Sequence, residues 1–305
     1  MTVSVAVIGE CMLELSHASS KNVDSEKAMW MKYGGDTINT SVYLARNGVS
    51  VSYVTGLGDD IMSDWLIEQW EGENVDCSMV TRMPNSVPGM YMINVTEEGE
   101  RSFLYWRKNS PASRLFDNKG AAEVTFQSIS GYPYLYLSGI SLAILAQSAC
   151  EHLIELMENY RRQGGKIIFD GNYRCKLWPT PDIAREVYTR VYKITDIALP
   201  TFEDEAELFG YDSVEEVLKS ISELGPKEIV VKMGSEGCLV FQDDEMRYVQ
   251  AHVVDPVDTT AAGDSFNAGY LAARFSGKIG PEACFAGHAL ASQVIQYQGA
   301  IIPRS

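Results

Sequence analysis

Basic residues are scarce in this sequence relative to acidic ones. Its 305 residues include 25 Lys and Arg against 41 Asp and Glu, which gives a formal net charge of −16 at pH 7. A surface this acidic repels nucleic acid phosphates and anionic lipids, which argues against both as partners. It also repels small anionic ligands, so a site for one of them needs a local cluster of Arg, Lys or backbone N–H groups.

Paired cysteines, long apolar runs and targeting segments are also missing. The six cysteines are scattered along the chain: Cys11, Cys77, Cys150, Cys175, Cys238 and Cys284. Without C-x-x-C or other paired spacing, they predict buried, reduced thiols rather than disulfides or a zinc site. No segment approaches the roughly 20 apolar residues of a membrane span. The apolar start, residues 1–9, is too short for a signal peptide. We therefore expect a cytoplasmic protein.

What is present is an alternation of strand-like and helix-like segments. Strands are expected at 3–8, 49–54, 134–137, 166–170, 194–199, 228–232 and 238–241. Helices are expected at 37–47, 61–73, 145–163, 265–276 and 281–296, and a further one begins near 203. This alternation predicts an α/β domain over residues 1–305, with a mostly parallel sheet covered on both faces.

Residues 89–107 break the alternation. Residues 90–95 and 102–107 have the pattern of two strands joined by a turn at 97–100. Little helix surrounds this hairpin, so we expect it to lie outside the main sheet.

The strongest chemical signal is the segment Asp258-Thr-Thr-Ala-Ala-Gly-Asp264, which precedes an apolar helix. Its small residues, Ala261, Ala262 and Gly263, let backbone N–H groups approach an anion closely at a helix N-terminus, which favours phosphate. Asp264 beside such a cradle is placed to accept a hydroxyl proton during phosphoryl transfer. The same aspartate could instead be a plain helix N-cap, and spacing alone leaves both interpretations open.

This segment resembles, at every position, the second signature of the ribokinase-like (pfkB) carbohydrate kinases. Residues 34–41, Gly-Gly-Asp-Thr-Ile-Asn-Thr-Ser, resemble their first signature, although Thr37 stands where a smaller residue is usual. Both patterns occur in the right order, so the resemblance covers essentially the whole chain. It implies a ribokinase-like α/β fold, with a doubly wound, mostly parallel sheet and a small β lid formed by residues of about 10–33 and 87–110.

The resemblance also implies a mechanism. Asp264 deprotonates a sugar hydroxyl, and Ala261 to Gly263 stabilise charge on the phosphoryl group that passes directly from ATP. Mg²⁺ is expected with ATP. Glu205 matches the acidic position of the family's Asn-x-x-Glu element and would help to organise Mg²⁺ through water, although Phe202 replaces the usual Asn. The alternative for this acidic run is a helix start stabilised by the dipole.

Nucleotide contacts are expected from a further set of residues: Asn172, Lys232, Gly234, Gly237, Gly263 and Ala300. Residues 232–237 follow a strand and resemble the family's Gly-rich nucleotide loop, although a plain β-turn is the better explanation when they are taken alone. Residues 299–303 resemble the family's closing segment by the adenine pocket. Many members bind a monovalent cation such as K⁺ near the positions of Asp258 and Ala300.

Two arginines suggest the class of substrate. Arg107 lies in the hairpin and Arg174 follows a strand end, where α/β sheets place ligands. Together they could grip a carboxylate, which a neutral hexose would not require. The alternative is that both form surface ion pairs.

Residues 101–113, RSFLYWRKNSPAS, closely resemble the corresponding stretch of the 2-keto-3-deoxygluconate kinases within this family. That resemblance implies 2-keto-3-deoxy-D-gluconate as substrate, phosphorylated at its terminal (6-) hydroxyl, which faces Asp264. The residues implied to hold the sugar acid are Gly34, Gly35, Asn39, Tyr91, Tyr105, Arg107 and Arg174. Tyr105 and Arg107 would bind its carboxylate and keto end, whereas Asn39 could instead orient the Gly34-Gly35 turn.

Other functions stay open. Within the class, the substrate could be fructose, ribose or 5-keto-2-deoxygluconate. The strand at 3–8 also suits a dinucleotide-binding oxidoreductase, but no G-x-G-x-x-G follows it. A non-catalytic sugar sensor on the same scaffold would have no need of a base at Asp264. Finally, the free strand edge of the lid hairpin predicts a homo-oligomer that pairs its lids.

Overall fold

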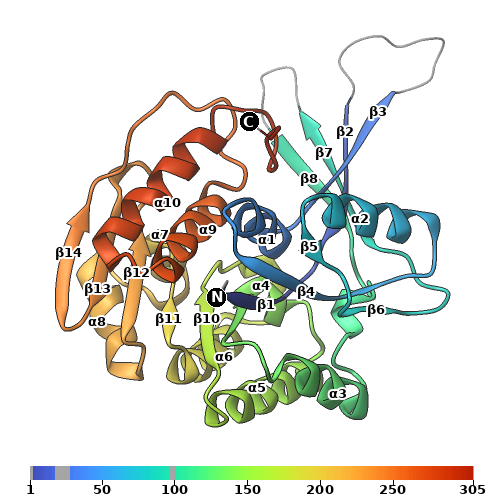
Figure 1. The fold of residues 1–305 in the computed structure, drawn as a ribbon, viewed down its shortest axis with the longest axis horizontal. Helices are drawn as coiled ribbons and strands as arrows, with labels where there is room; N and C mark the ends of the chain where they lie inside the picture. Colours follow the sequence, from blue (N-terminus) through green and yellow to red (C-terminus); the bar gives the residue numbers. More distant parts are fainter. Residues whose placement is uncertain (1–2, 18–27, 96–100, 305) are drawn as a thin grey trace.

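The strands that the structure describes form one large sheet and one small sheet (Figure 1). The structure is a computed structural model, and it describes residues 3–17, 28–95 and 101–304. The strands of the large sheet are β1 (Ser4–Ile8), β4 (Ser50–Leu57), β5 (Val75–Asp76), β6 (Val80–Arg82), β9 (Tyr134–Ser138), β10 (Lys166–Asp170), β11 (Ile197–Ala198), β12 (Glu228–Lys232), β13 (Cys238–Gln242) and β14 (Glu245–Val249). Their order is β14-β13-β12-β11-β10-β9-β1-β4-β5, with β6 also paired to β4.

The large sheet is parallel from β12 to β5, and β13 and β14 extend it in antiparallel fashion. The strand order reverses around β1, because the chain runs from β1 to β4 on one side and later to β9 and β10 on the other. In sheets of this type, ligands bind outside the carboxyl ends of the strands at the point of reversal. Gly9, Ser138 and Asp170 lie at these ends and mark the expected site.

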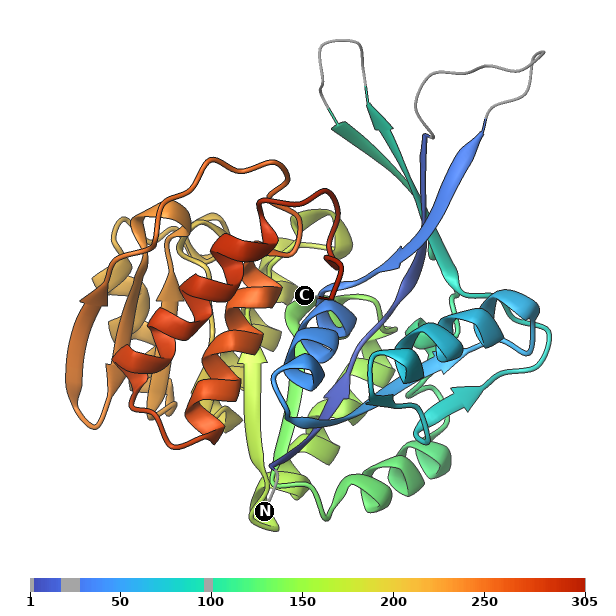
Figure 2. The ribbon, with the colours of Figure 1, turned by 45° about the horizontal axis from the view of Figure 1, so that its top comes forward.

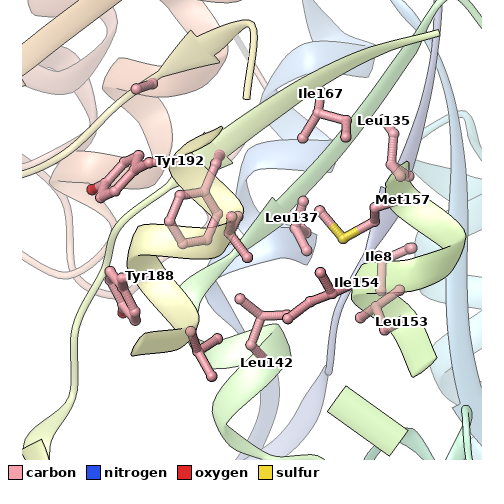
Figure 3. Packing of buried hydrophobic residues seen from close by; sticks show 14 of the residues in the cluster. Ile8, Leu135, Leu137, Leu142, Leu153, Ile154, Met157, Ile167, Tyr188 and Tyr192 are labelled. Atoms are coloured by element: carbon pink, nitrogen blue, oxygen red, sulfur yellow. The ribbon is translucent and has the colours of Figure 1, made fainter. Parts of the chain in front are cut away.

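Helices cover both faces of the large sheet. One face carries α1 (Asp36–Arg46), α2 (Ile61–Gly72), α9 (Ala262–Phe275) and α10 (Gly280–Val294). The other carries α3 (Lys119–Ile129), α4 (Gly139–Ala143), α5 (Gln147–Arg162), α6 (Pro181–Ile194), α7 (Phe202–Phe209) and α8 (Val214–Leu224). Along β1 the buried side chains alternate between two apolar clusters, with Val5 and Val7 in the first and Ala6 and Ile8 in the second. Figure 3 shows part of the second cluster, where side chains of β1, β9 and β10 meet those of α5 and α6.

Local sequence explains where several of these helices begin and end. Asp60 caps α2, because its carboxylate accepts from the N–H groups of Met62 at 2.9 Å and Ser63 at 3.2 Å. After α1, Gly48 adopts φ 80°, a left-handed conformation that favours glycine and ends the helix. The helix therefore stops where β4 must begin.

The small sheet has the order β3-β2-β7-β8 and stands away from the large one (Figure 2). Its strands are β2 (Met12–His17), β3 (Met29–Gly34), β7 (Gly89–Val95) and β8 (Arg101–Trp106). The hairpin of β7 and β8 confirms the prediction that this segment lies outside the main sheet. The parallel pairing of β2 with β7 joins segments that are far apart in the chain. The predicted turn at 97–100 lies outside the described residues.

Other expectations need correction. The helix predicted at 145–163 is confirmed as α5, whereas the short helix α4 before it was not predicted. The strand predicted at 194–199 shrinks to β11 because α6 continues to Ile194. The helix predicted from 265 begins at Ala262. All six cysteines are free, as predicted, but Cys77 is only half-buried and Cys175 is exposed. None of the helices within the described ranges has the length and hydrophobicity that a membrane crossing needs.

Candidate active site

The N-terminus of α9 forms an open backbone turn at the expected edge of the sheet. Ala261 precedes the helix with φ 61°, and the first helical hydrogen bond runs from the Ser265 N–H to the Ala261 carbonyl at 2.9 Å. The Ala262 N–H bonds to the Thr259 carbonyl at 3.2 Å. Helix geometry leaves the next two N–H groups without intrahelical acceptors, and Gly263 is exposed. Such a turn can bind an anion.

Asp264 lies in the first turn of α9 and contacts another helix. Nδ2 of Asn39, in α1, donates to Asp264 Oδ2 at 2.8 Å. No side-chain hydrogen bond caps α9, so the interpretation of Asp264 as a plain N-cap is wrong. The side-chain amide of Asn39 thus contacts the predicted base, and it is the backbone N–H of Asn39 that bonds to the Gly35 carbonyl, at 2.9 Å. Within the described residues, its buried Oδ1 has no partner and remains available to a ligand hydroxyl.

The surroundings of Asp264 favour its protonated form. Burial raises the pKa of this carboxyl well above its ordinary value, and the nearby charges of Asp36 and Asp170 raise it further. The Asn39 hydrogen bond and the Lys232 ammonium act in the opposite direction. A raised pKa makes the ionised form of this carboxyl a stronger base toward a hydroxyl proton.

A buried polar network lies close to this turn. Lys232 Nζ, at the end of β12, donates to Asp170 Oδ1 and to Asn267 Oδ1, each at 3.0 Å. Asn267 Nδ2 in turn donates to Asp170 Oδ2 at 2.9 Å and to the Tyr136 hydroxyl at 3.1 Å. A Cβ on Gly263 would lie 3.8 Å from Lys232 Nζ, so the ammonium adds positive charge next to the turn. Direct contact of Lys232 with a nucleotide stays a prediction.

The loop after β10 is tied to the start of α1. Asn172 Nδ2 donates to Asp36 Oδ2 at 2.7 Å, and the Thr37 N–H donates to Asp36 Oδ1 at 2.9 Å. Burial raises the pKa of Asp36. The link fixes the N-terminus of α1, and with it Asn39, beside the carboxyl end of β10. The expected nucleotide contact of Asn172 stays a prediction.

The small sheet presents the predicted tyrosines next to the first signature. The Tyr91 hydroxyl donates to Glu14 Oε2 at 2.5 Å, and a Cβ on Gly34 would lie 2.7 Å from that hydroxyl. Glycine at position 34 therefore makes room for the tyrosine. Tyr105 pairs with Tyr91 across β7 and β8, with ring centroids 5.9 Å apart, and is 54% exposed. Tyr105 thus has surface free for a ligand.

The two predicted arginines differ in their surroundings. Arg107 donates to Glu10, and the two side chains are only 15% and 2% exposed. Arg174 Nη1 lies 3.1 Å from Asp204 Oδ1, and the arginine side chain is 50% exposed. The surface ion pair considered above therefore fits Arg174 but not Arg107. Their joint grip on a ligand carboxylate stays a prediction.

Glu205 is completely buried in α7. The Tyr192 hydroxyl donates to its Oε1 at 2.5 Å, whereas Oε2 has no partner in the part of the chain that the structure describes. Burial raises the pKa of Glu205 to about 8. Its environment differs from that of a solvated acid at a helix start, and its role near Mg²⁺ stays a prediction.

The nucleotide loop and the C-terminal segment have clear structural roles of their own. Gly237, which follows the short turn Gly234–Glu236, has φ 109°, and a Cβ there would lie 2.1 Å from the Val249 carbonyl. Asp258 Oδ2 accepts from the Gly299 N–H at 3.0 Å, which ties its loop to the C-terminal segment. The Ala300 carbonyl in that segment accepts from the Tyr43 hydroxyl at 2.7 Å. The nucleotide and cation contacts expected here stay predictions.

Comparison with known proteins agrees with this geometry. Residues 3–305 match the pfkB family of carbohydrate kinases. The chain belongs to this family. A dinucleotide-binding oxidoreductase is thereby set aside.

Several relatives match the chain from end to end. It is 45% identical over 312 residues to 2-dehydro-3-deoxygluconokinase of Escherichia coli (strain K12), covering 100% of this chain and 98% of the relative. Its fold matches the crystal structure of 2-dehydro-3-deoxygluconokinase from Thermotoga maritima with a TM-score of 0.86, 19% identity and coverage of 98% and 96%. It also matches a putative Ribokinase II from E. coli, solved in complex with ATP and Mg²⁺, with a TM-score of 0.83, 22% identity and coverage of 98% and 94%. At these identities the two structural matches show the ribokinase-like α/β fold alone.

Sequence reasoning missed the polar residues that hold the site together: Glu10, Glu14, Asp36, Tyr136, Asp170 and Asn267. Some signals were present. Glu10 follows the first strand, and Asp170 ends another, which is where α/β sheets place ligands. Asn267 and Asp36 lie within or next to the two signatures.

Proposed function

We propose that this protein transfers the γ-phosphoryl group of ATP to the 6-hydroxyl of 2-keto-3-deoxy-D-gluconate, also called 2-dehydro-3-deoxy-D-gluconate. The products are 2-keto-3-deoxy-6-phosphogluconate and ADP. The observation that carries the proposal is the Asn39–Asp264 hydrogen bond at the open N-terminus of α9, which puts a carboxylate beside an anion-binding turn. The name and the 45% identity of the E. coli relative support the choice of substrate.

In this mechanism the carboxylate of Asp264 takes the proton from the sugar hydroxyl. The hydroxyl oxygen forms a bond to the γ-phosphorus in line with the bond that breaks, and ADP leaves with that electron pair. The open N–H groups of Gly263 and its neighbours, with the Lys232 ammonium nearby, stabilise the negative charge of the transferring group. None of the candidate residues is a plausible phosphorylated nucleophile, so transfer is direct.

Mg²⁺ would enter with ATP and neutralise charge on its phosphates. Glu205 fits a role in organising it through water, because Oε2 has no partner among the described residues. We assign the monovalent cation, K⁺, to the loop that Asp258 ties to Gly299. Nucleotide contacts fall to Asn172, Lys232, Gly234, Gly237, Gly263 and Ala300. We place the reaction in the cytoplasm.

The sugar acid would lie between the N-terminus of α1 and the small sheet, which acts as a lid. Its binding residues are Gly34, Gly35, Asn39, Tyr91, Tyr105, Arg107 and Arg174. In this proposal the 54% exposed Tyr105 and the adjacent Arg107 receive the carboxylate and keto end. Closure of the lid excludes water and so suppresses hydrolysis of ATP.

The test is an assay of ADP release with Mg²⁺, ATP and one of five acceptors: 2-keto-3-deoxygluconate, fructose, ribose, 5-keto-2-deoxygluconate or gluconate. We expect strong turnover with the first alone. Arg107→Ala should lower kcat/KM for that acid about 10- to 100-fold, because a hydrogen bond to a charged group contributes about 1.5–3 kcal/mol. Preference for fructose, ribose or 5-keto-2-deoxygluconate, or an unaffected Arg107→Ala variant, would contradict the choice of substrate and leave a carbohydrate kinase of other specificity.

A further inference from the structure

Glu10 lies where the strands of the small sheet join the core. It occupies the link between β1 and β2. Between β3 and α1, a Cβ on Gly35 would lie 2.3 Å from the Glu10 carbonyl oxygen. At the start of β7, a Cβ on Gly89 would lie 3.0 Å from Glu10 Oε1. After β8, Arg107 and Ser110 both donate to the Glu10 carboxylate. All four crossings between core and small sheet therefore meet at this residue.

The contacts of the Glu10 carboxylate are buried. Glu10 is 3% exposed and Ser110 is 5% exposed. Ser110 Oγ donates to Oε1 at 2.5 Å, and Arg107 Nη2 donates to Oε2. The Arg107 side chain is 15% exposed, and within the described residues its buried Nε has no partner. Glu10 is thus the carboxylate that keeps this guanidinium within the fold.

We propose that Glu10 is a positioning residue that holds the Arg107 guanidinium at the base of the small sheet, ready for the carboxylate of the sugar acid. The inference rests on the proposed function, because it concerns how the assigned acid-binding arginine is oriented. It goes further in giving a buried acid outside both family signatures a part in substrate specificity. It also ties recognition of the acid to the place where the lid meets the core.

The direction of the effect follows from the cost of a buried charge. Keeping a buried guanidinium in place without its partner carboxylate costs several kcal/mol of free energy, so the side chain turns toward water instead. Removing the Glu10 charge also removes a repulsion that the substrate carboxylate feels, and this favours binding. The loss of orientation dominates, because a misplaced guanidinium forfeits its charge-assisted hydrogen bonds to the ligand altogether.

The experiment compares Glu10→Gln with wild-type protein by steady-state kinetics, varying 2-keto-3-deoxygluconate and ATP separately. We expect the KM for the acid to rise about tenfold while the KM for ATP stays within twofold. Glu73→Gln is the matched control. Glu73 is a partly buried acid that pairs with Arg46 at 2.8 Å and Arg304 at 2.9 Å, on other elements of the fold. The Glu73→Gln variant should have a lower melting temperature than wild-type protein and an unchanged KM for both the acid and ATP.

Each outcome of this comparison either supports or contradicts the role of Glu10. If Glu10→Gln lowers the melting temperature as Glu73→Gln does, but leaves the KM for the acid unchanged or lower, Glu10 is only structural and the inference fails. If wild-type protein does not turn over the acid, the proposed function fails and the inference with it. Should Glu10→Gln not fold, Ser110→Ala replaces it, because this variant removes the other donor to the same carboxylate. We expect a smaller rise in the KM for the acid, of about threefold, and an unchanged KM would overturn the inference.

Discussion

At the scale of single residues, the two signatures predict the chemistry but not the environment that tunes it. The small residues before α9 and the aspartate after them are readable as an anion turn with a base. The partner of that base, Asn39, lies 225 positions earlier in the chain, so no local pattern reveals the hydrogen bond. The same holds for Lys232 and Asp170, which meet only because their strands end at the same edge of the sheet.

The role of Asp264 is tested by Asp264→Asn. The amide has nearly the same shape and can still accept from Asn39, but it cannot take the sugar proton. We expect kcat to fall by about 10²–10⁴-fold, the usual contribution of general base catalysis, while ATP binding measured by calorimetry is retained. Asp255→Asn, an exposed change in the preceding loop, should leave kcat unaltered.

A non-catalytic sensor gives the opposite result. It would keep its sugar-dependent function in Asp264→Asn and show no ATP-dependent turnover to lose. A kcat within tenfold of wild type in Asp264→Asn would likewise contradict the assignment of this carboxylate as the base.

Burial of Glu205 predicts a pH-dependent stability. Its pKa is about 8 in the folded protein against an ordinary value of 4.5, because burial disfavours the charged form. Between these values the unfolded chain releases this proton and the folded chain keeps it, so folding loses stability as pH rises from about 4.5 to 8. Glu205→Gln has no proton to lose. We expect the variant to be more stable than wild type by on the order of 3 kcal/mol near pH 8, with the difference vanishing near pH 4.5.

Urea unfolding at several pH values, without Mg²⁺ or nucleotide, measures this difference. Glu203→Gln is the control, since it removes an exposed acid from the same helical turn and should behave as wild type. A Glu205→Gln variant that gains no stability between pH 5 and pH 8 would show that Glu205 ionises normally in the folded protein.

At the scale of elements, length and regularity decide what a sequence reveals. The strands and helices that carry the signatures are long and apolar on a clear period, and they were predicted with small errors at their ends. Strands β5 and β6 have two and three residues, too few to show any period. Helix α6 did have a signal, with Thr180 as N-cap, Pro181 at its first position and Val187 and Val191 on one buried face.

The small sheet shows the limit of local reasoning. Two strand-like segments joined by a short turn are a local sequence pattern, so the pairing of β7 with β8 could be predicted. Strand β2 pairs with β7 in parallel, Glu14 opposite Tyr91, over a separation of 77 residues. This register depends on how the whole small sheet is assembled from segments that are distant in the chain. The hydrogen bond from Tyr91 to Glu14 could therefore not be predicted from the sequence.

At the scale of the molecule, one face of the small sheet is apolar and unusually exposed. Register places Leu15, Met31, Met92 and Leu104 on one face, and Met31 and Leu104 are 38% and 48% exposed. Glu14, Tyr91 and Tyr105, which belong to the proposed site, share the opposite face. Among the described strands, β3 and β8 are the edges of this sheet, and with the exposed apolar surface they favour pairing with a second copy, which stays a prediction.

We therefore expect two chains to associate through their lids, burying the face that contains Leu104. Light scattering after size exclusion should give the mass of two chains for wild-type protein. Leu104→Glu places a charge on that face, on strand β8, and should shift the mass to that of one chain, because an unpaired buried charge costs several kcal/mol. Val124→Glu is the matched control: it adds the same charge at a 61% exposed valine on α3 and should leave the mass of two chains. The prediction is contradicted if wild-type protein has the mass of one chain, or if the Leu104→Glu variant keeps the mass of two chains. Either result would show that this apolar face does not form the interface between two chains.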